Sequence, residues 1–231
     1  MQKGNMKIEC VLFDLDGTLA DTSQDMCDSL NRILKTRNLE QVDCYNLKAY
    51  ISSGAIGMIE YASKVNGRSI DSSLIRSEFL EDYKNNCFIK TKLNPNMDQL
   101  LNYLLDKEIK IGIVTNKHSR YVNNIVKGLG IEKDLSCVVT GDMVLNAKPA
   151  SDSLIKAAEL VQSSVENVMY VGDDERDIIA GKKAGMITVA ANFGFISDEI
   201  SINAWEADII IDDPLYLRDY LVNENKSFTV N

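Results

Sequence analysis

The chain has 231 residues, of which 45% are hydrophobic and 26% are charged, and its formal net charge is −9. This composition is typical of a soluble globular protein with a sizeable core, built as one large or two moderate domains. The acidic balance argues against nucleic acid or an anionic membrane as the main partner, although local positive charge in a pocket can still attract an anionic substrate.

The sequence gives no sign of a membrane anchor or of an oxidising compartment. No stretch approaches the length needed to cross a bilayer, and the first residues lack a signal-peptide pattern, so we expect a cytoplasmic protein. The five cysteines are widely spaced and form no Cys-x-x-Cys motif, so we expect reduced, mostly buried thiols and neither a disulfide framework nor a zinc site. These cysteines are Cys10, Cys27, Cys44, Cys87 and Cys137.

The segment 10–19 is an apolar run that ends in two carboxylates, a glycine and a threonine. It predicts a buried strand whose tip carries Asp14 and Asp16 on the same side, followed by a sharp turn at Gly17. Two crowded carboxylates repel each other unless a cation or a shared proton relieves them, so the pair indicates a divalent metal site. The alternative is that Asp-Gly is only a turn and that Asp14 is a solvated strand end.

The next segment, to about residue 90, has the periodicity of helices and no convincing strand. Thr22 is predicted to cap the first helix with Asp25 in the capping-box position, and Asp71 to cap a later one. Asp21 either helps a hinge or caps the adjoining helix, and the second use is the commoner.

From residue 95 onward, helices and strands alternate. Apolar runs predict strands at 109–115, 137–140, 168–171, 187–191 and 209–211. Helical spacing predicts helices near 97–105, 122–129 and 154–161, around 178–179, and from 214 onward. The polar tail from Asn223 is expected to fray.

This alternation indicates an α/β fold with a doubly wound parallel sheet, because apolar strands of this kind are covered on both faces. The helical segment inserted after the first strand would form a small cap over the carboxyl ends of the strands, where ligands bind in such sheets. We therefore expect a catalytic core made of residues 1–20 and 91–231, and a helical cap domain made of residues 21–90.

Three further strand ends carry polar motifs. Thr115 and Asn116 belong to a Thr-Asn-Lys turn, where a hydroxyl and backbone N–H groups can hold phosphate oxygens. Lys148 precedes Pro149, which is expected to start a helix and fix the direction of the lysine. The acidic stretch 172–177 follows a later strand. Taken singly, each motif also fits an ordinary helix cap or a solvated surface.

In their order along the chain, these four elements resemble the catalytic motifs of the haloacid dehalogenase (HAD) superfamily. The resemblance covers nearly the whole chain and implies a HAD-like Rossmannoid core. Within the superfamily the chain looks most like the phosphoglycolate phosphatase-like group, and more closely like the N-acetylmuramic acid 6-phosphate phosphatases. The closer likeness is carried by the segments 51–55, 78–83, 172–178 and 205–208.

The resemblance implies roles for the acidic residues and a Mg²⁺ cofactor. Asp14 would be the nucleophile that forms an aspartyl-phosphate, and Asp16 would act as general acid and base. Mg²⁺ would be held by Asp14, the backbone carbonyl of Asp16, and Asp173. Asp174 and Asp177 would support this set of ligands.

The resemblance also implies the phosphate ligands. Thr115, Asn116 and Lys148 would hold the phosphoryl oxygens, and the lysine would offset the repulsion between nucleophile and phosphate. His118 and Ser151 stand where relatives often carry proline. His118, the only histidine, is expected at the surface near a helix start, with a phosphate contact as the minor alternative.

The expected function is hydrolysis of a small phosphorylated metabolite by a monomer or homodimer, with phosphoglycolate and N-acetylmuramic acid 6-phosphate as the leading substrates. A phosphomutase of the β-phosphoglucomutase kind shares every catalytic residue and differs in keeping water out. A catalytically silent binding protein would lack a motif residue, and none is missing.

The predicted cap region carries the specificity in this interpretation. The small residues at 52–54 would help to select the leaving group, and Arg68 or Lys64 would hold the second carboxylate of phosphoglycolate. Dehalogenase chemistry is disfavoured because it needs no Asp16. Phosphonate hydrolysis needs a Schiff-base lysine, and neither Lys48 nor Lys64 lies in such a motif.

Overall fold

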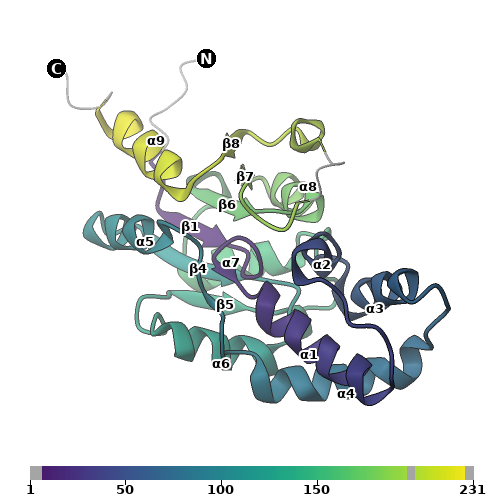
Figure 1. The fold of residues 1–231 in the computed structure, drawn as a ribbon. Helices are drawn as coiled ribbons and strands as arrows, with labels where there is room; N and C mark the ends of the chain where they lie inside the picture. Colours follow the sequence, from purple (N-terminus) through teal and green to yellow (C-terminus); the bar gives the residue numbers. More distant parts are fainter. Residues whose placement is uncertain (1–6, 197–200, 227–231) are drawn as a thin grey trace.

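A six-stranded parallel sheet in the order β5-β4-β1-β6-β7-β8 lies at the centre of the molecule (Figure 1). The computed structural model describes residues 7–196 and 201–226. The strands are β1 Cys10–Phe13, β4 Lys110–Val114, β5 Cys137–Val139, β6 Val168–Gly172, β7 Ile187–Ala191 and β8 Ile209–Ile211. All neighbouring strands run parallel.

Helices cover both faces of the sheet, which confirms the predicted doubly wound α/β class. Alternate residues of a strand point to opposite faces, so Val11 and Phe13 pack with α5, α6 and α9, whereas Cys10 and Leu12 pack with α7 and α8. The helices are α5 Met97–Asp106, α6 Ser119–Leu129, α7 Asp152–Val161, α8 Glu175–Ala184 and α9 Pro214–Lys226. Three short 3-10 helices are η1 Gly141–Met143, η2 Val165–Asn167 and η3 Ile202–Trp205.

Four further helices form the segment between the first strand and the rest of the sheet. They are α1 Ser23–Thr36, α2 Cys44–Ile51, α3 Gly54–Val65 and α4 Ser72–Asn86. In Figure 1 they lie together beyond the end of the sheet towards which the β1 arrow points. Asp71 caps α4 as predicted, because its carboxylate accepts the N–H of Ser73 at 2.9 Å.

Two very short strands mark where the chain leaves and re-enters the core. β2 Ala20–Asp21 and β3 Lys92–Leu93 pair antiparallel. The sequence did not predict them, because two residues are too few to show the alternation that identifies a strand. This pair ties both ends of the four-helix segment to one point of the core.

The predicted capping box of Thr22 and Asp25 is wrong. Thr22 donates its hydroxyl to Asp16 at 2.5 Å, and Asp21 caps α1 instead by accepting a backbone N–H of the first turn at 3.0 Å. Asp25 is buried and accepts the backbone N–H groups of residues 89–91. The carboxylate is satisfied by a distant segment, and local spacing carries no sign of that contact.

The expectation of five reduced cysteines is wrong for two of them. Cys27 on α1 and Cys44 on α2 form a disulfide, with their Cα atoms 5.5 Å apart. The packing of α1 against α2 brings them together, and their wide spacing along the chain does not indicate it. Cys10, Cys87 and Cys137 are free and buried, as expected.

The remaining differences concern boundaries. Pro149 does not start a helix, since α7 begins at Asp152, and the Lys148–Pro149 peptide bond is cis. The polar residues from Asn223 to Lys226 belong to α9, and the rest of the predicted tail, like residues 1–6, lies outside the described residues. Within the described ranges, no helix combines the length and apolar character needed to cross a bilayer.

Candidate active site

Asp14 lies directly after β1, at the carboxyl end of the central strand. Its backbone N–H donates to the carbonyl of Val171 at 2.8 Å, and its carbonyl accepts the N–H of Leu19 at 3.2 Å. Gly17, with a φ of 87°, lets the chain fold back between these anchors. Burial raises the pKa of Asp14 to about 6, against the opposing charge of Lys148. The fold therefore holds a nearly enclosed carboxylate in a fixed position.

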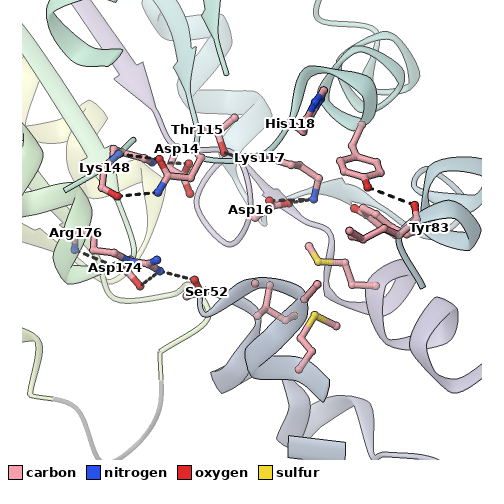
Figure 2. Close-up of a pocket in the computed structure, with 18 of the residues that line it drawn as sticks. Asp14, Asp16, Ser52, Tyr83, Thr115, Lys117, His118, Lys148, Asp174 and Arg176 are labelled. Atoms are coloured by element: carbon pink, nitrogen blue, oxygen red, sulfur yellow. Dashed lines mark hydrogen bonds and ion pairs between the residues drawn. The ribbon is translucent and has the colours of Figure 1, made fainter. Parts of the chain in front are cut away.

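Lys148 is the cationic partner of Asp14 (Figure 2). Its Nζ lies 2.8 Å from Asp14, 2.6 Å from Asp177, 2.7 Å from the Tyr170 hydroxyl and 3.1 Å from the Val114 carbonyl. Burial alone would lower the pKa of this lysine, but the two carboxylates outweigh it and raise the pKa. Lys148 therefore carries its positive charge in an enclosed place beside the predicted nucleophile.

Tyr170 is a member of this group that the sequence analysis missed. It is fully buried on β6, and its hydroxyl lies 3.0 Å from Asp177 and 2.9 Å from the Val114 carbonyl. It appears in the sequence only as one residue of an apolar strand, and nothing there indicates that its hydroxyl meets Lys148. Its hydroxyl holds the ammonium of Lys148 in place, so the side chain of Lys148 has little freedom to move.

Asp173 lies at the end of the neighbouring strand β6 and is held by two hydrogen bonds. Thr18 donates its hydroxyl to one oxygen at 2.7 Å, and the N–H of Phe195 donates to the other at 2.7 Å. Two glycines leave room for the carboxylate, because a Cβ on Gly17 would come within 2.1 Å of Asp173 and one on Gly194 within 2.2 Å. The loops after β1 and β7 thus form a cradle around Asp173.

Three buried carboxylates gather at this point. Oxygen atoms of Asp14, Asp173 and Asp177 all lie within 4.8 Å of one another. The pKa of Asp173 is raised well above its usual range, first by burial and then by repulsion from the other two carboxylates. A divalent cation with oxygen ligands would relieve this repulsion, so the residues fit Mg²⁺.

The predicted phosphate ligands lie beside Asp14. Thr115 is buried, and its hydroxyl accepts the N–H of Lys117 at 3.2 Å. The amide of Asn116 bonds at both ends to the backbone of Lys148, donating to its carbonyl and accepting its N–H, each at 2.9 Å. The side chain of Asn116 therefore positions the lysine, which leaves the backbone of Asn116 for a phosphate contact.

Asp16 faces away from the carboxylate cluster and pairs with Lys117. The ammonium lies 2.8 Å from one carboxylate oxygen and 3.0 Å from the other. The same Nζ lies 4.7 Å from the centre of the Tyr83 ring and 6.0 Å from that of Tyr121. Figure 2 shows Lys117 and Asp16 on the Tyr83 side of the site, away from Lys148. Nothing in the sequence pattern indicates a role for Lys117.

A cavity of about 310 Å³ opens over these residues, between the core and α1–α4. Ser52 and Gly54 line it, as predicted for the segment 52–54. Arg68 and Lys64, expected to hold a second carboxylate, are not among its lining residues in the described part of the chain. Lys64 instead lies over the ring of Tyr50, with its Nζ 5.3 Å from the centre.

Asp174 and Arg176 connect the core to the helical segment. The carboxylate of Asp174 caps α8 by accepting the N–H of Arg176 at 2.9 Å, and it pairs with the guanidinium at 2.7 Å. Arg176 also donates to the carbonyl of Ser52 (Figure 2). Asp21 pairs with Lys48 of α2 at 3.0 Å and makes a second such link.

His118 is placed as expected, at the start of α6. Its ring Nδ1 accepts the N–H of Arg120 at 3.2 Å, and its side chain is 50% exposed. The residue also lines the cavity, so a contact with a bound anion is within its reach.

The fold and this arrangement of strand-end residues define a haloacid dehalogenase-like hydrolase. The model of that family matches residues 11–191, and the chain belongs to it. The N-acetylmuramic acid 6-phosphate phosphatase of Pseudomonas putida strain KT2440 is 36% identical over 213 residues, which cover 92% of this chain and 96% of that protein. The phosphoglycolate phosphatase of Xanthomonas campestris pv. campestris strain 8004 is 32% identical over 204 residues, covering 88% of this chain and 92% of that protein.

A solved structure shares the fold. It is described as a predicted phosphoglycolate phosphatase from Haemophilus somnus 129PT, and it matches with a TM-score of 0.83 at 24% identity, covering 94% of this chain and 99% of that one. Together with the curated relatives, the family match confirms the expectation of a phosphatase of the haloacid dehalogenase type.

Proposed function

We propose that the protein is a Mg²⁺-dependent phosphatase that hydrolyses a phosphorylated metabolite through an aspartyl-phosphate on Asp14. The observation that carries this proposal is the grouping of Asp14 with the ammonium of Lys148 and the carboxylates of Asp173 and Asp177, in the lining of a cavity. A carboxylate and a phosphate dianion repel each other. This repulsion is reduced where the carboxylate lies beside a buried ammonium and beside a site for a metal cation.

In the first step, a carboxylate oxygen of Asp14 attacks the phosphorus, and the bond to the leaving oxygen breaks. Asp16 donates its proton to that oxygen, so an alcohol leaves. Lys148, Thr115 and the backbone of Asn116 hold the phosphoryl oxygens. Mg²⁺, held by Asp14, Asp173 and the carbonyl of Asp16, would neutralise charge on these oxygens.

In the second step, water attacks the phosphorus and the bond to Asp14 breaks. Asp16, now ionised, takes the proton from the water, which regenerates both carboxyl groups and releases phosphate. Lys117 orients the carboxyl group of Asp16, because its ammonium lies 2.8 Å from one of the carboxyl oxygens. The two roles of Asp16 thus use one residue in two protonation states.

For the substrate, the size of the cavity favours N-acetylmuramic acid 6-phosphate over phosphoglycolate. A volume of about 310 Å³ lies within the range of sites for drug-sized ligands, and phosphoglycolate would leave much of it to water. Both compounds appear in the names of curated relatives, and both carry a carboxylate on the leaving group.

The test is a panel of phosphate esters, including both compounds, compared by kcat/KM with Mg²⁺ and with EDTA. Asp14→Asn should lower kcat by about a thousandfold or more, because the nucleophile is lost. Asp134→Asn is the matched control, since Asp134 is exposed in a turn away from the cavity. Turnover retained by Asp14→Asn would contradict the mechanism, and uniformly low activity across the panel would contradict the substrate assignment.

A further inference from the structure

Two arginines line the cavity without an acidic partner. Arg76 lies on α4 and Arg120 on α6, so they reach the cavity from the helical segment and from the core. Within residues 7–196 and 201–226, neither forms an ion pair with a carboxylate, whereas Arg32, Arg37 and Arg176 each do. In a chain of net charge −9, two guanidinium groups left facing one cavity indicate an anionic ligand.

Arg120 lies on the side of the cavity where the leaving group must sit. Lys117 joins Asp16, the proposed acid, to the ring of Tyr121, at 2.8 Å and 6.0 Å. The guanidinium of Arg120 in turn lies 4.7 Å from the centre of that ring. This chain of contacts leads away from Asp14 and Lys148, so Arg120 belongs to the leaving-group side and not to the phosphate side.

Arg76 lies farther out along the same wall. It shares a face of α4 with Phe79, Leu80 and Tyr83, all of which line the cavity. Tyr83 contacts Lys117 and lies seven positions after Arg76 along the helix, a rise of about 10 Å along the axis.

Arg76 and Arg120 flank Tyr121 from two elements. The hydroxyl of Tyr121 donates to the carbonyl of Leu80 on α4, at 3.3 Å. Burial raises the pKa of Tyr121, and the charges of Arg120 and Arg76 act against that rise, so both cations lie within electrostatic reach of one side chain.

We propose that Arg76 and Arg120 form a subsite for a carboxylate on the leaving group, remote from the reacting phosphate. This inference rests on the proposed phosphatase function and extends it to the part of the substrate that is not transferred. Guanidinium groups bind carboxylates through paired hydrogen bonds, and two of them can share one carboxylate.

The position of the subsite selects the class of substrate. In phosphoglycolate a single carbon separates the carboxylate from the ester oxygen, so the carboxylate stays next to the reacting phosphate. A phosphorylated sugar acid has a sugar ring between phosphate and carboxylate, so its carboxylate lies farther from the phosphate, on the side of Arg76 and Arg120. The cavity also has an apolar part that suits the ring and its methyl substituents; it is lined by Met26, Ile51, Ala55, Met58, Phe79 and Leu80.

The experiment compares N-acetylmuramic acid 6-phosphate with N-acetylglucosamine 6-phosphate, which lacks only the lactyl ether and its carboxylate. The measured quantity is the ratio of kcat/KM for the acid to kcat/KM for the neutral sugar. We expect this ratio to fall about tenfold or more in Arg76→Gln and in Arg120→Gln, because each loses a charged hydrogen bond to the carboxylate. Both side chains are exposed, so neither substitution disturbs the core.

Arg68→Gln is the matched control, because Arg68 is exposed between α3 and α4 and lines no part of this cavity. It should leave the ratio unchanged. A ratio that Arg76→Gln and Arg120→Gln leave unchanged would overturn the proposal. So would an equal fall in Arg68→Gln, because the effect would then be one of overall charge.

A binding measurement separates this proposal from the proposed function. The two sugar phosphates are titrated into Asp14→Asn protein by calorimetry, with and without Arg76→Gln. The subsite is supported if Asp14→Asn binds the acid more tightly than the neutral sugar and if Arg76→Gln abolishes this difference. This result would support the subsite even if the wild-type enzyme hydrolyses neither compound and the proposed function fails. Equal binding of the two compounds overturns the subsite, whatever the activity.

Discussion

Lys117 shows how a single residue acquires a role through its surroundings. Its side chain is 8% exposed, and its ammonium is held between the carboxylate of Asp16 and the rings of Tyr83 and Tyr121. These partners come from the loop after β1, from α4 and from α6, three parts of the chain that are far apart in the sequence. The geometry places Lys117 where it orients the proposed acid and base.

Replacement of Lys117 by methionine is expected to lower kcat about 10- to 100-fold, with a smaller change in KM. The substitution keeps much of the apolar stem but removes the charge that holds Asp16, and general acid–base catalysis contributes effects of this size or larger. Steady-state kinetics would check it, because loss of a contact that positions Asp16 should appear in kcat more than in KM. Lys127→Met, at the exposed end of α6, is the control. An unaltered kcat would mean that Lys117 only packs.

Among the elements, α1 depends on a contact that reaches across the chain. Asp25 accepts the N–H groups of Ile89, Lys90 and Thr91, and also the hydroxyl of Thr91, at 2.8 to 3.0 Å. The carboxylate therefore fastens α1 to the segment that returns from α4 to the core, next to the β2–β3 pair.

Asp25→Ala is expected to lower the free energy of unfolding by about 3 kcal/mol. The substitution leaves backbone N–H groups without an acceptor, beside the space that the carboxylate had filled. Urea unfolding would measure the change. Asp28→Ala on the same helix is the control. Asp28 forms a half-exposed pair with Lys90 and accepts a hydrogen bond from Gln24, so its loss should cost under about 1 kcal/mol. Similar losses in the two variants would show that Asp25 has no special part in fastening α1.

In the molecule as a whole, acidic groups are concentrated around one buried positive charge. The chain carries a net charge of −9, yet its buried lysine Lys148 meets the carboxylates of Asp14 and Asp177 in one place. With Asp173, three carboxylates share this site with a single buried ammonium. The folded state therefore contains repulsion that a divalent cation would relieve.

Mg²⁺ is accordingly expected to stabilise the fold. At a hundredfold excess over its Kd, a ligand that binds only the folded state adds about 2.7 kcal/mol. For a chain of this size, that corresponds to a rise in Tm of about 5 to 10 °C. Differential scanning calorimetry with Mg²⁺ and with EDTA would measure it. Asp173→Asn should lose the rise and Asp134→Asn should keep it, whereas a rise retained by Asp173→Asn would remove Asp173 from the metal site.

Much of the architecture was predictable because it depends on local patterns. The strands at 187–191 and 209–211 have the predicted bounds, since apolar runs mark strands that are buried on both faces. The strand predicted at 109–115 is shorter by one residue at each end, because burial extends beyond the hydrogen-bonded ladder. The strands β2 and β3 escaped prediction because they consist of a few residues whose pairing is decided by distant chain.

The same division holds at the site. The parallel α/β fold could be predicted from the sequence, and so could the meeting of Asp14, Thr115 and Asp173, because the carboxyl ends of parallel strands meet at one edge. The side chains around them became visible only in the folded chain: the Asp16–Lys117 pair, Tyr170 beside Lys148, the disulfide and the two arginines of the cavity. Those contacts depend on how the helical segment packs against the core. Long-range packing of this kind produces no periodic pattern in the sequence from which it could be predicted.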